Sequence, residues 1–376
     1  MTAAALAVVG VGVFSARLAA ANVFVLATLL LAARAWKSGK LAGQPWARCL
    51  VAPLVVFAAI SFLSALWSLE PSISLGKLGR LLVFFLVPAA AALLDDRWWP
   101  RLVVGVAGMA TVLAVWGIIE YSMGADSLQH RIQGPLSHYM TYSGWLLLAV
   151  LVLVGHGLLG GSRWIWLLAP ASLGVVALLL SYTRNAWVGL GVGLLLLAAV
   201  WRRRLLLVYP VVVLAVWALF PRAVVERAVS MVDLRQEANY DRLCMVASGV
   251  EMVRDHPWLG VGPDMVKRLY PLYRRDDAPR WRVPHLHNNA LQIAAERGLP
   301  ALGVYLWLLV AFFTRTWRSL PSLAGVRRAA VAATLIAVAG ITAAGLFEYN
   351  FWDAEVQYLT LVLMGAGVGM SERGPA

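Results

Sequence analysis

The chain has 376 residues, of which 61% are hydrophobic and 14% charged, and its formal net charge is +13. A mean hydropathy of +0.75 excludes an ordinary water-soluble domain, in which about half of the residues are apolar. The two cysteines, Cys49 and Cys244, are too few for a disulfide framework or a thiolate metal site. The sequence therefore predicts an all-α polytopic membrane protein, a bundle of transmembrane helices.

Apolar runs recur from one end of the chain to the other, and a helix needs about 20 mostly apolar residues to cross the hydrocarbon core of a bilayer. We expect about twelve spans, at 2–14, 18–35, 49–67, 77–94, 102–122, 139–157, 164–182, 186–201, 205–220, 299–316, 326–346 and 356–371. The first span is short and Arg17 separates it from the second, so this pair is either a re-entrant hairpin or two full crossings. The first apolar stretch lacks a basic leading region, so we expect no cleaved signal peptide.

Basic residues gather in one alternating set of the loops between these spans. They are Arg34, Lys37, Lys40, Arg48, Arg97, Arg101, Arg163, Arg202, Arg203, Arg204, Arg315, Arg318, Arg327 and Arg328. Lysine and arginine mark the cytoplasmic side of a membrane protein, so both termini are expected in the cytoplasm. The positive charge thus indicates membrane topology, and we expect membrane lipids but no nucleic acid as partners.

One soluble segment of substantial size remains, and with this topology it lies outside the cytoplasm. We divide the chain into helices 1–9 at 1–220, a large periplasmic loop at 221–298 and helices 10–12 at 299–376. Loops of this length are usually functional. Within the loop, 241–253 has its valines at helical spacing and predicts an amphipathic helix at the membrane surface. A second helix is expected at 287–296, ended by Gly298 and Pro300.

Two histidines and two asparagines meet the top of the tenth predicted span, within Arg282–Gly303. His287, Asn288 and Asn289 can cap the following helix, since asparagine is a favoured N-cap. Alternatively, His285 and His287 can bind a metal together with a carboxylate, although no HExxH pair is present. In the third interpretation His287 is a general base, because an imidazole titrates near neutral pH and can take a proton from a sugar hydroxyl.

Arginines surround this histidine segment in the predicted topology. Arg184 lies in the very short outer loop Ser181–Ala186, where a charge so close to the bilayer core indicates function unless its side chain snorkels to the interface. Arg242 begins the amphipathic stretch. Four more precede His287, namely Arg274, Arg275, Arg280 and Arg282. A guanidinium binds phosphate with two parallel hydrogen bonds and stays charged, which suits a diphosphate donor.

The predicted loops lack some of the residues and motifs with which many enzymes bind a metal ion or a nucleotide. The first outer loop has no acidic residue, so we expect no metal ion and no other cofactor. The short cytoplasmic loops contain no P-loop, and the glycine turn at His256–Pro263 completes no dinucleotide fingerprint. An activated substrate must therefore arrive already in the membrane.

Several segments together resemble the O-antigen ligase superfamily, which includes O-antigen polymerases and bacterial O-oligosaccharyltransferases. They are Trp67–Pro71 ahead of Lys77 and Arg80, Thr183–Ala186, Arg242 with Asp255–Gly262, and His287–Asn289 leading to Gly298. The family pattern continues with a second glycine three residues later, where this chain has Ala301 and then Gly303.

The resemblance implies a GT-C-like helical bundle that moves a glycan from undecaprenyl diphosphate to an acceptor. By position, His287 matches the catalytic histidine of the family. Arg184, Arg242 and, less closely, Arg80 match positions that bind the donor diphosphate. Asn288, Arg282 and Arg275 are expected to support them.

The activity expected from this resemblance is that of an O-antigen ligase in lipopolysaccharide biosynthesis. Such an enzyme is a metal-independent, inverting glycosyltransferase whose acceptor is a sugar hydroxyl on lipid A-core, and it works in the inner membrane with a periplasmic active site. The late position of the large loop favours a ligase over a polymerase. The alternatives are an O-antigen polymerase, an O-oligosaccharyltransferase and, from another class, a lipid or glycan transporter.

Overall fold

The described part of the chain is helical. A computed structural model describes residues 1–39, 43–45, 47–202, 204, 207, 214, 218, 221–231, 233 and 235–373. Within these residues the β contacts amount to one isolated bridge, between Asp126 and Arg131. The predicted all-α class is confirmed over this part of the chain.

The first half of the chain contains helices α1 (Thr2–Phe14), α2 (Leu18–Lys37), α3 (Arg48–Leu66), α4 (Pro71–Gly76), the 3-10 helix η1 (Leu78–Phe85), α5 (Leu86–Leu93), α6 (Trp99–Ser122), α7 (Tyr139–Leu159), the 3-10 helix η2 (Ser162–Leu167) and α8 (Leu168–Leu180). The second half contains α9 (Arg184–Trp201), α11 (Arg222–Val229), α12 (Glu237–Asp255), α13 (Val266–Tyr273), α14 (Asn289–Ser319), the 3-10 helix η4 (Leu320–Ser322), α15 (Gly325–Ala344) and α16 (Ala354–Glu372).

Nine helical segments among the described residues are long and apolar enough to cross a membrane, and each coincides with one of the twelve predicted spans. At the first predicted span the helix α1 has 13 residues, short of the roughly 20 that a crossing needs. The last predicted span is the helix α16, which is not among the nine because Glu355 and Gln357 lower its hydropathy. The ninth predicted span, 205–220, falls almost wholly outside the described residues.

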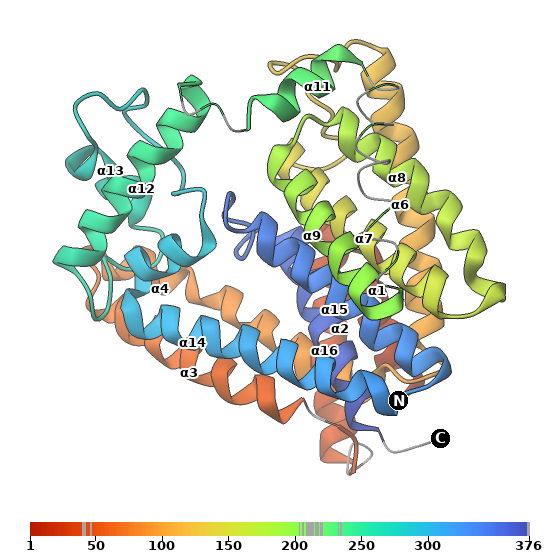
Figure 1. Cartoon of the computed structure of the whole chain (residues 1–376). Coiled ribbons are helices and arrows are strands. Elements are labelled where there is room, and N and C mark those ends of the chain that lie inside the picture. Colours follow the sequence, from red (N-terminus) through yellow and green to blue (C-terminus); the bar gives the residue numbers. More distant parts are fainter. Residues whose placement is uncertain are drawn as a thin grey trace.

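Helix α7 is the centre of the bundle. Its residues 141–153 are buried, and it packs against α6, α8, α9 and α15. Figure 1 shows these helices on one side of the molecule, with α3 and α14 side by side on the other. In the same view α12 and α13 lie at the end of the bundle away from the N-terminus.

Small residues bring α9 and α15 unusually close together. A Cβ atom on Gly189 of α9 would lie 2.6 Å from the carbonyl oxygen of Gly340 in α15. Two helices in a membrane pack tightly where such residues face each other, because their backbones can then approach. Since α9 begins at Arg184 and α15 ends just before Glu348, this contact holds the two ends near each other.

The large loop has a small core of its own. Helix α12 buries Met245 and Met252, which pack with Val266 and Tyr270 of α13. The helix predicted at 241–253 is therefore confirmed. One apolar face of α12 stays accessible, and its Val246 is 41% exposed. Docking at the membrane surface through that face stays a prediction.

The glycine turn of the large loop packs directly on a kink in α14. At Gly298 the backbone has φ 82° and ψ 170°, a conformation that only glycine adopts freely. The amide of Leu299 donates a hydrogen bond of 2.7 Å to the carbonyl of Pro257, and that of Val261 donates one of 2.8 Å to Ala295. The backbone of the turn thus lies close to that of α14, and these hydrogen bonds tie the loop to the top of this helix.

Replacing Gly298 with alanine should therefore destabilise the protein. A Cβ atom there would lie 2.1 Å from the carbonyl oxygen of Trp258, and the positive φ adds strain, so we expect a loss of at least about 2 kcal/mol. Thermal unfolding of the detergent-solubilised protein measures this loss as a drop of the melting temperature by several degrees. Gly303→Ala is the matched control on the same helix, because a Cβ atom there meets nothing within 4 Å. Equal melting temperatures for the two variants would contradict the packing described here.

Candidate functional site

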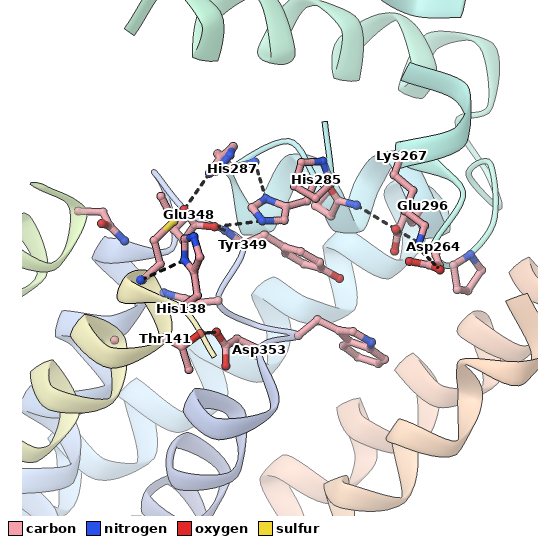
Figure 2. A pocket seen from close by; sticks show the side chains of 18 of the residues that line it. His138, Thr141, Asp264, Lys267, His285, His287, Glu296, Glu348, Tyr349 and Asp353 are labelled. Carbon is pink, nitrogen blue, oxygen red and sulfur yellow. Dashed lines mark hydrogen bonds and ion pairs between the residues drawn. The ribbon is translucent and has the colours of Figure 1, made fainter. Parts of the chain in front are cut away.

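One buried carboxylate joins the two histidines of the loop. Nδ1 of His287 lies 2.8 Å from Oε2 of Glu348, and Nε2 of His285 lies 3.4 Å from Oε1 of the same residue. The Glu348 side chain is 7% exposed and that of His287 is 10% exposed. Figure 2 shows Glu348 between the two imidazoles, so that each of its oxygens faces one ring.

Asparagines fix the backbone on both sides of this contact. Asn288 caps α14, since its Oδ1 accepts a hydrogen bond of 2.8 Å from the amide of Leu291, which confirms the capping interpretation for this residue. The buried Asn289 donates to Oδ1 of Asn350 over 2.8 Å and accepts from the amide of Phe351. The start of α14 is thus joined to the segment between α15 and α16, which contains Glu348.

His287 itself has a left-handed backbone, with φ 50°. A non-glycine residue in this region is uncommon, and strained residues gather at functional sites. The strained conformation lets its amide donate to Nδ1 of His285 over 3.3 Å. The site therefore depends on a conformation that local propensity does not favour.

The hydrogen bonds determine where the protons lie on the two rings. Because Nδ1 of His285 accepts from a backbone amide, the proton of its neutral ring is on Nε2, facing Glu348. With Glu348 ionised, Nδ1 of His287 donates to it. Nε2 of His287 then carries a lone pair and has no hydrogen-bond partner within the described residues, as a general base requires.

Burial controls the titration of this group of residues. It lowers the pKa of His285 to about 4, so this ring is neutral at pH 7. Burial alone would raise the pKa of Glu348, but the hydrogen bond from His287 and electrostatic attraction to the two imidazoles hold it below its usual value. The carboxylate is thus ionised at neutral pH, where it orients His287 and can stabilise its protonated form.

The same three side chains form a possible ligand set for a metal ion. The candidate ligand atoms of His285, His287 and Glu348 all lie within 4.8 Å of one another, and two histidines with a glutamate are a common zinc set. However, Nε2 of His285 carries the proton of the neutral ring, and this proton would have to leave before that atom could bind an ion. The hydrogen-bonded arrangement needs no ion, and independence from metal stays a prediction that chelation can test.

Three hollows meet at His287. The apolar hollow, of about 280 Å³, is lined by Arg184, Arg242 and aliphatic side chains that include Val188, Leu243 and Leu346. The arginine hollow, of about 440 Å³, is lined by five arginines and two acidic residues: Arg131, Arg184, Arg227, Arg242, Arg280, Glu237 and Asp241. The polar hollow, of about 610 Å³, is lined by Lys77, Arg80, Lys267, Glu348 and Asp353. His287 lines all three.

Arg280 pairs with Asp241, whereas the other four arginines of this hollow have no ion pair within the described part of the chain. Arg184 is 6% exposed, and its guanidinium donates to neutral oxygens alone, including Gln236 at 3.0 Å and Asn239 at 2.6 Å. Burial and the charges of the other three arginines lower the pKa of Arg227 to about 10. Such mutual repulsion is relieved when an anion binds between the guanidiniums.

Arg80, the third arginine expected at the diphosphate, lies elsewhere. It lines the polar hollow and donates a hydrogen bond of 3.0 Å to the carbonyl of Trp352. Arg275 is exposed and pairs with Asp277 through two hydrogen bonds of 2.9 Å. Arg282 is exposed as well and lines none of the three hollows. Of the expected supporting residues, Asn288 alone lines one of them, the apolar hollow.

Several residues of this site escaped sequence reasoning. Glu348 is one of three acids in the short segment between the last two predicted spans, with Asp353 and Glu355, and that clustering was a usable signal. Arg131 and Arg227 looked like ordinary loop residues, because their meeting with Arg184 depends on the packing of distant helices.

The polar hollow rests on a buried ion pair. Arg297 donates a hydrogen bond of 2.6 Å to Glu296, and its guanidinium stacks 4.8 Å from the ring centre of Trp352. Gln292 bridges this pair to the histidine segment, since it donates to Glu296 over 2.9 Å and accepts from the amide of Leu286 over 2.8 Å. These contacts support the loop that presents His287.

Acidification should destabilise the protein through His285. Its folded pKa lies below the ordinary value of 6.5, so between about pH 6.5 and pH 4 the unfolded chain binds a proton that the folded protein excludes. Stability is therefore full above pH 6.5 and falls as the pH drops, by about 1 to 2 kcal/mol at pH 5. Melting temperatures from pH 7.5 to pH 5 measure the decline, and His285→Asn should reduce it. An unchanged decline in that variant would refute the assignment to His285.

Two comparisons with known proteins bear on this site. No curated protein matches the chain. Residues 169–306 match the family model described as O-antigen ligase, a stretch that runs from α8 into α14 and includes Arg184, Arg242 and His287. This match supports a member of the O-antigen ligase family and rests on residues 169–306 of the chain.

Proposed function

We propose that the protein is an O-antigen ligase, which transfers a glycan from undecaprenyl diphosphate to a sugar hydroxyl on lipid A-core. The observation that carries this proposal is the position of His287, which lines both a polar hollow and a hollow where four arginines have no ion pair among the described residues. A diphosphate supplies the anion that the arginines lack. The acceptor sugar then occupies the polar hollow, on the other side of the imidazole.

In the proposed reaction the acceptor oxygen attacks the anomeric carbon of the donor as the bond from that carbon to the diphosphate oxygen breaks. Nε2 of His287 takes the proton of the attacking hydroxyl, and Glu348 stabilises the imidazolium that forms. Arg184 and Arg242 stabilise the charge that develops on the leaving diphosphate. Attack opposite to the leaving group inverts the anomeric centre, and the reaction uses neither a metal ion nor another cofactor.

The apolar hollow provides a place for the start of the polyprenyl chain, because Arg184 and Arg242 line it together with aliphatic side chains. In this proposal the protein lies in the bacterial inner membrane with its termini in the cytoplasm and the 221–298 segment in the periplasm. The donor reaches the arginines from the membrane, and the hydroxyl of the acceptor reaches His287 from the periplasmic side.

Removing the base should abolish transfer. We expect His287→Ala to lower kcat by about 10² to 10⁴-fold, the usual contribution of a general base, with the protein still folded in the membrane. Transfer between purified donor and lipid A-core in detergent, without any ion gradient, measures the effect and also separates an enzyme from a transporter.

The matched control is His256→Ala, which removes an exposed histidine of the same loop that lines none of the three hollows. Full activity of His287→Ala would refute the role of this residue. Wild-type activity that chelators abolish and zinc restores would refute a metal-independent reaction. Glycan analysis of a deletion strain distinguishes the ligase from a polymerase, since loss of a ligase leaves long polymer on its carrier.

Neutralising Arg242 should weaken donor binding selectively. Its guanidinium has no hydrogen-bond partner within the described residues, so Arg242→Ala removes no structural contact, and loss of a charge-assisted phosphate contact of about 1.5 to 3 kcal/mol predicts a 10 to 100-fold higher donor KM. Arg254→Ala, at an exposed position of the same helix, is the control. Carrier-lipid binding that is equal in both variants would exclude Arg242 from the diphosphate site.

A further inference from the structure

The polar hollow contains a second cationic group, separate from the arginine hollow. Lys77, Arg80 and Lys267 line the polar hollow but not the arginine hollow, whereas Arg184 and Arg242 do not line the polar one. The two groups of cations therefore lie in different hollows, although His287 and Arg280 line both. A single diphosphate bound at the arginines leaves this second group unoccupied.

Among the described residues, one carboxylate forms ion pairs with this group of cations. Nζ of Lys77 and Nζ of Lys267 share one carboxylate oxygen, Oδ2 of Asp264, at 3.3 Å and 2.8 Å. Arg80 has no ion pair among the described residues, and the one hydrogen bond found for it goes to a backbone carbonyl. Two lysines thus share a single carboxylate, while Glu348 and Asp353, which also line the hollow, contact His285, His287 and Thr141 instead.

The arrangement of these cations is held by the fold. Lys77 precedes η1 and Arg80 follows three residues later, so the near-threefold 3-10 turn places both side chains on one face. Lys267 comes from α13, a helix far along the chain from Lys77 and Arg80. Figure 2 shows Lys267 next to Asp264, further along the hollow from His287 and His285.

Asp264 is fixed through its backbone. It has φ 68°, and its amide donates a hydrogen bond of 3.0 Å to Oε1 of the buried Glu296. Ser74 joins the two elements as well, because its hydroxyl donates to the carbonyl of Pro263 over 2.9 Å. The carboxylate thus positions both lysines and neutralises only part of their charge.

We propose that Lys77, Arg80 and Lys267 bind an anionic group of the acceptor glycolipid, a phosphate or a sugar carboxylate, and so hold its reactive hydroxyl at His287. This inference rests on the proposed function, because it takes the polar hollow as the acceptor side. The volume of about 610 Å³ lies within the range of sites for small molecules, which fits a sugar with a charged substituent. The site would select charged acceptors over neutral ones of the same shape.

Kinetics with the purified full-length chain test the proposal. The acceptor is lipid A-core in three forms: untreated, dephosphorylated, and with its carboxylates esterified. We expect the double variant Lys77→Ala/Arg80→Ala, and Lys267→Ala, to raise the acceptor KM at least tenfold while the donor KM changes less than twofold. Arg268→Ala is the matched control, since Arg268 is next to Lys267 but pairs with Glu70 at 2.8 Å and does not line the hollow.

The modified acceptors identify the charged group. Removing the group that the site recognises should raise the acceptor KM of the wild-type protein as much as the double variant does, and should cause no further loss in that variant. Loss with the dephosphorylated form points to phosphate, and loss with the esterified form points to a carboxylate. Equal KM values of the wild-type protein for all three forms would overturn the proposal, and so would a rise in donor KM in place of acceptor KM.

Binding of the acceptor alone separates this inference from the proposed function. Trp352 lines the polar hollow, so its fluorescence should report titration with untreated lipid A-core in the absence of donor. The ligase would be refuted, and the anion site kept, by two results together: the wild-type protein transfers no glycan, and the double variant Lys77→Ala/Arg80→Ala binds this acceptor more weakly than the wild-type protein does. Binding unaffected by the double variant would refute the anion site even if transfer occurs.

Discussion

The ionised carboxylate of Glu348, buried at the end of the bundle, is the interaction on which the site depends. A buried charge is costly unless hydrogen bonds satisfy it, and two imidazoles from another segment of the chain satisfy this one. The same contact determines which nitrogen of His287 is exposed to substrate. Asn289 holds the two segments together, so the strained backbone of His287 and the partner of its ring are set by one network.

In the proposed function, unpaired positive charge in the two hollows beside that network would hold the two substrates. Arginines gather on one side without any carboxylate partner in the described part of the chain, and burial makes their repulsion more costly. On the other side, two lysines share one carboxylate, and Arg80 has no ion pair among the described residues. Both groups retain charge that a ligand can neutralise. An imidazole that lines both hollows suits the proposed transfer, in which the leaving group is an anion and the nucleophile is a hydroxyl.

The transmembrane helices, in contrast, follow from local sequence. Runs such as 102–122 and 139–157 are apolar over the length that a bilayer requires, and helices form there because no other structure satisfies the backbone inside a membrane. The helix at 241–253 and the break at Gly298 were also predictable, since helical spacing and a glycine–proline pair are local signals. The weakest expectations were at α1 and α16, where short length or polar residues blur the signal.

The sequence by itself determined that the protein is helical, that it has many apolar spans, and that His287, Arg184 and Arg242 deserved notice. It did so because hydropathy and short motifs depend on neighbouring residues. Tertiary structure alone decided that Glu348 is the partner of His287, that Arg131 and Arg227 join the other arginines, and that Arg80 lies with Lys77 and Lys267 in a different hollow. These contacts join residues tens to hundreds of positions apart, and only the close packing of helices such as α9 against α15 brings them together.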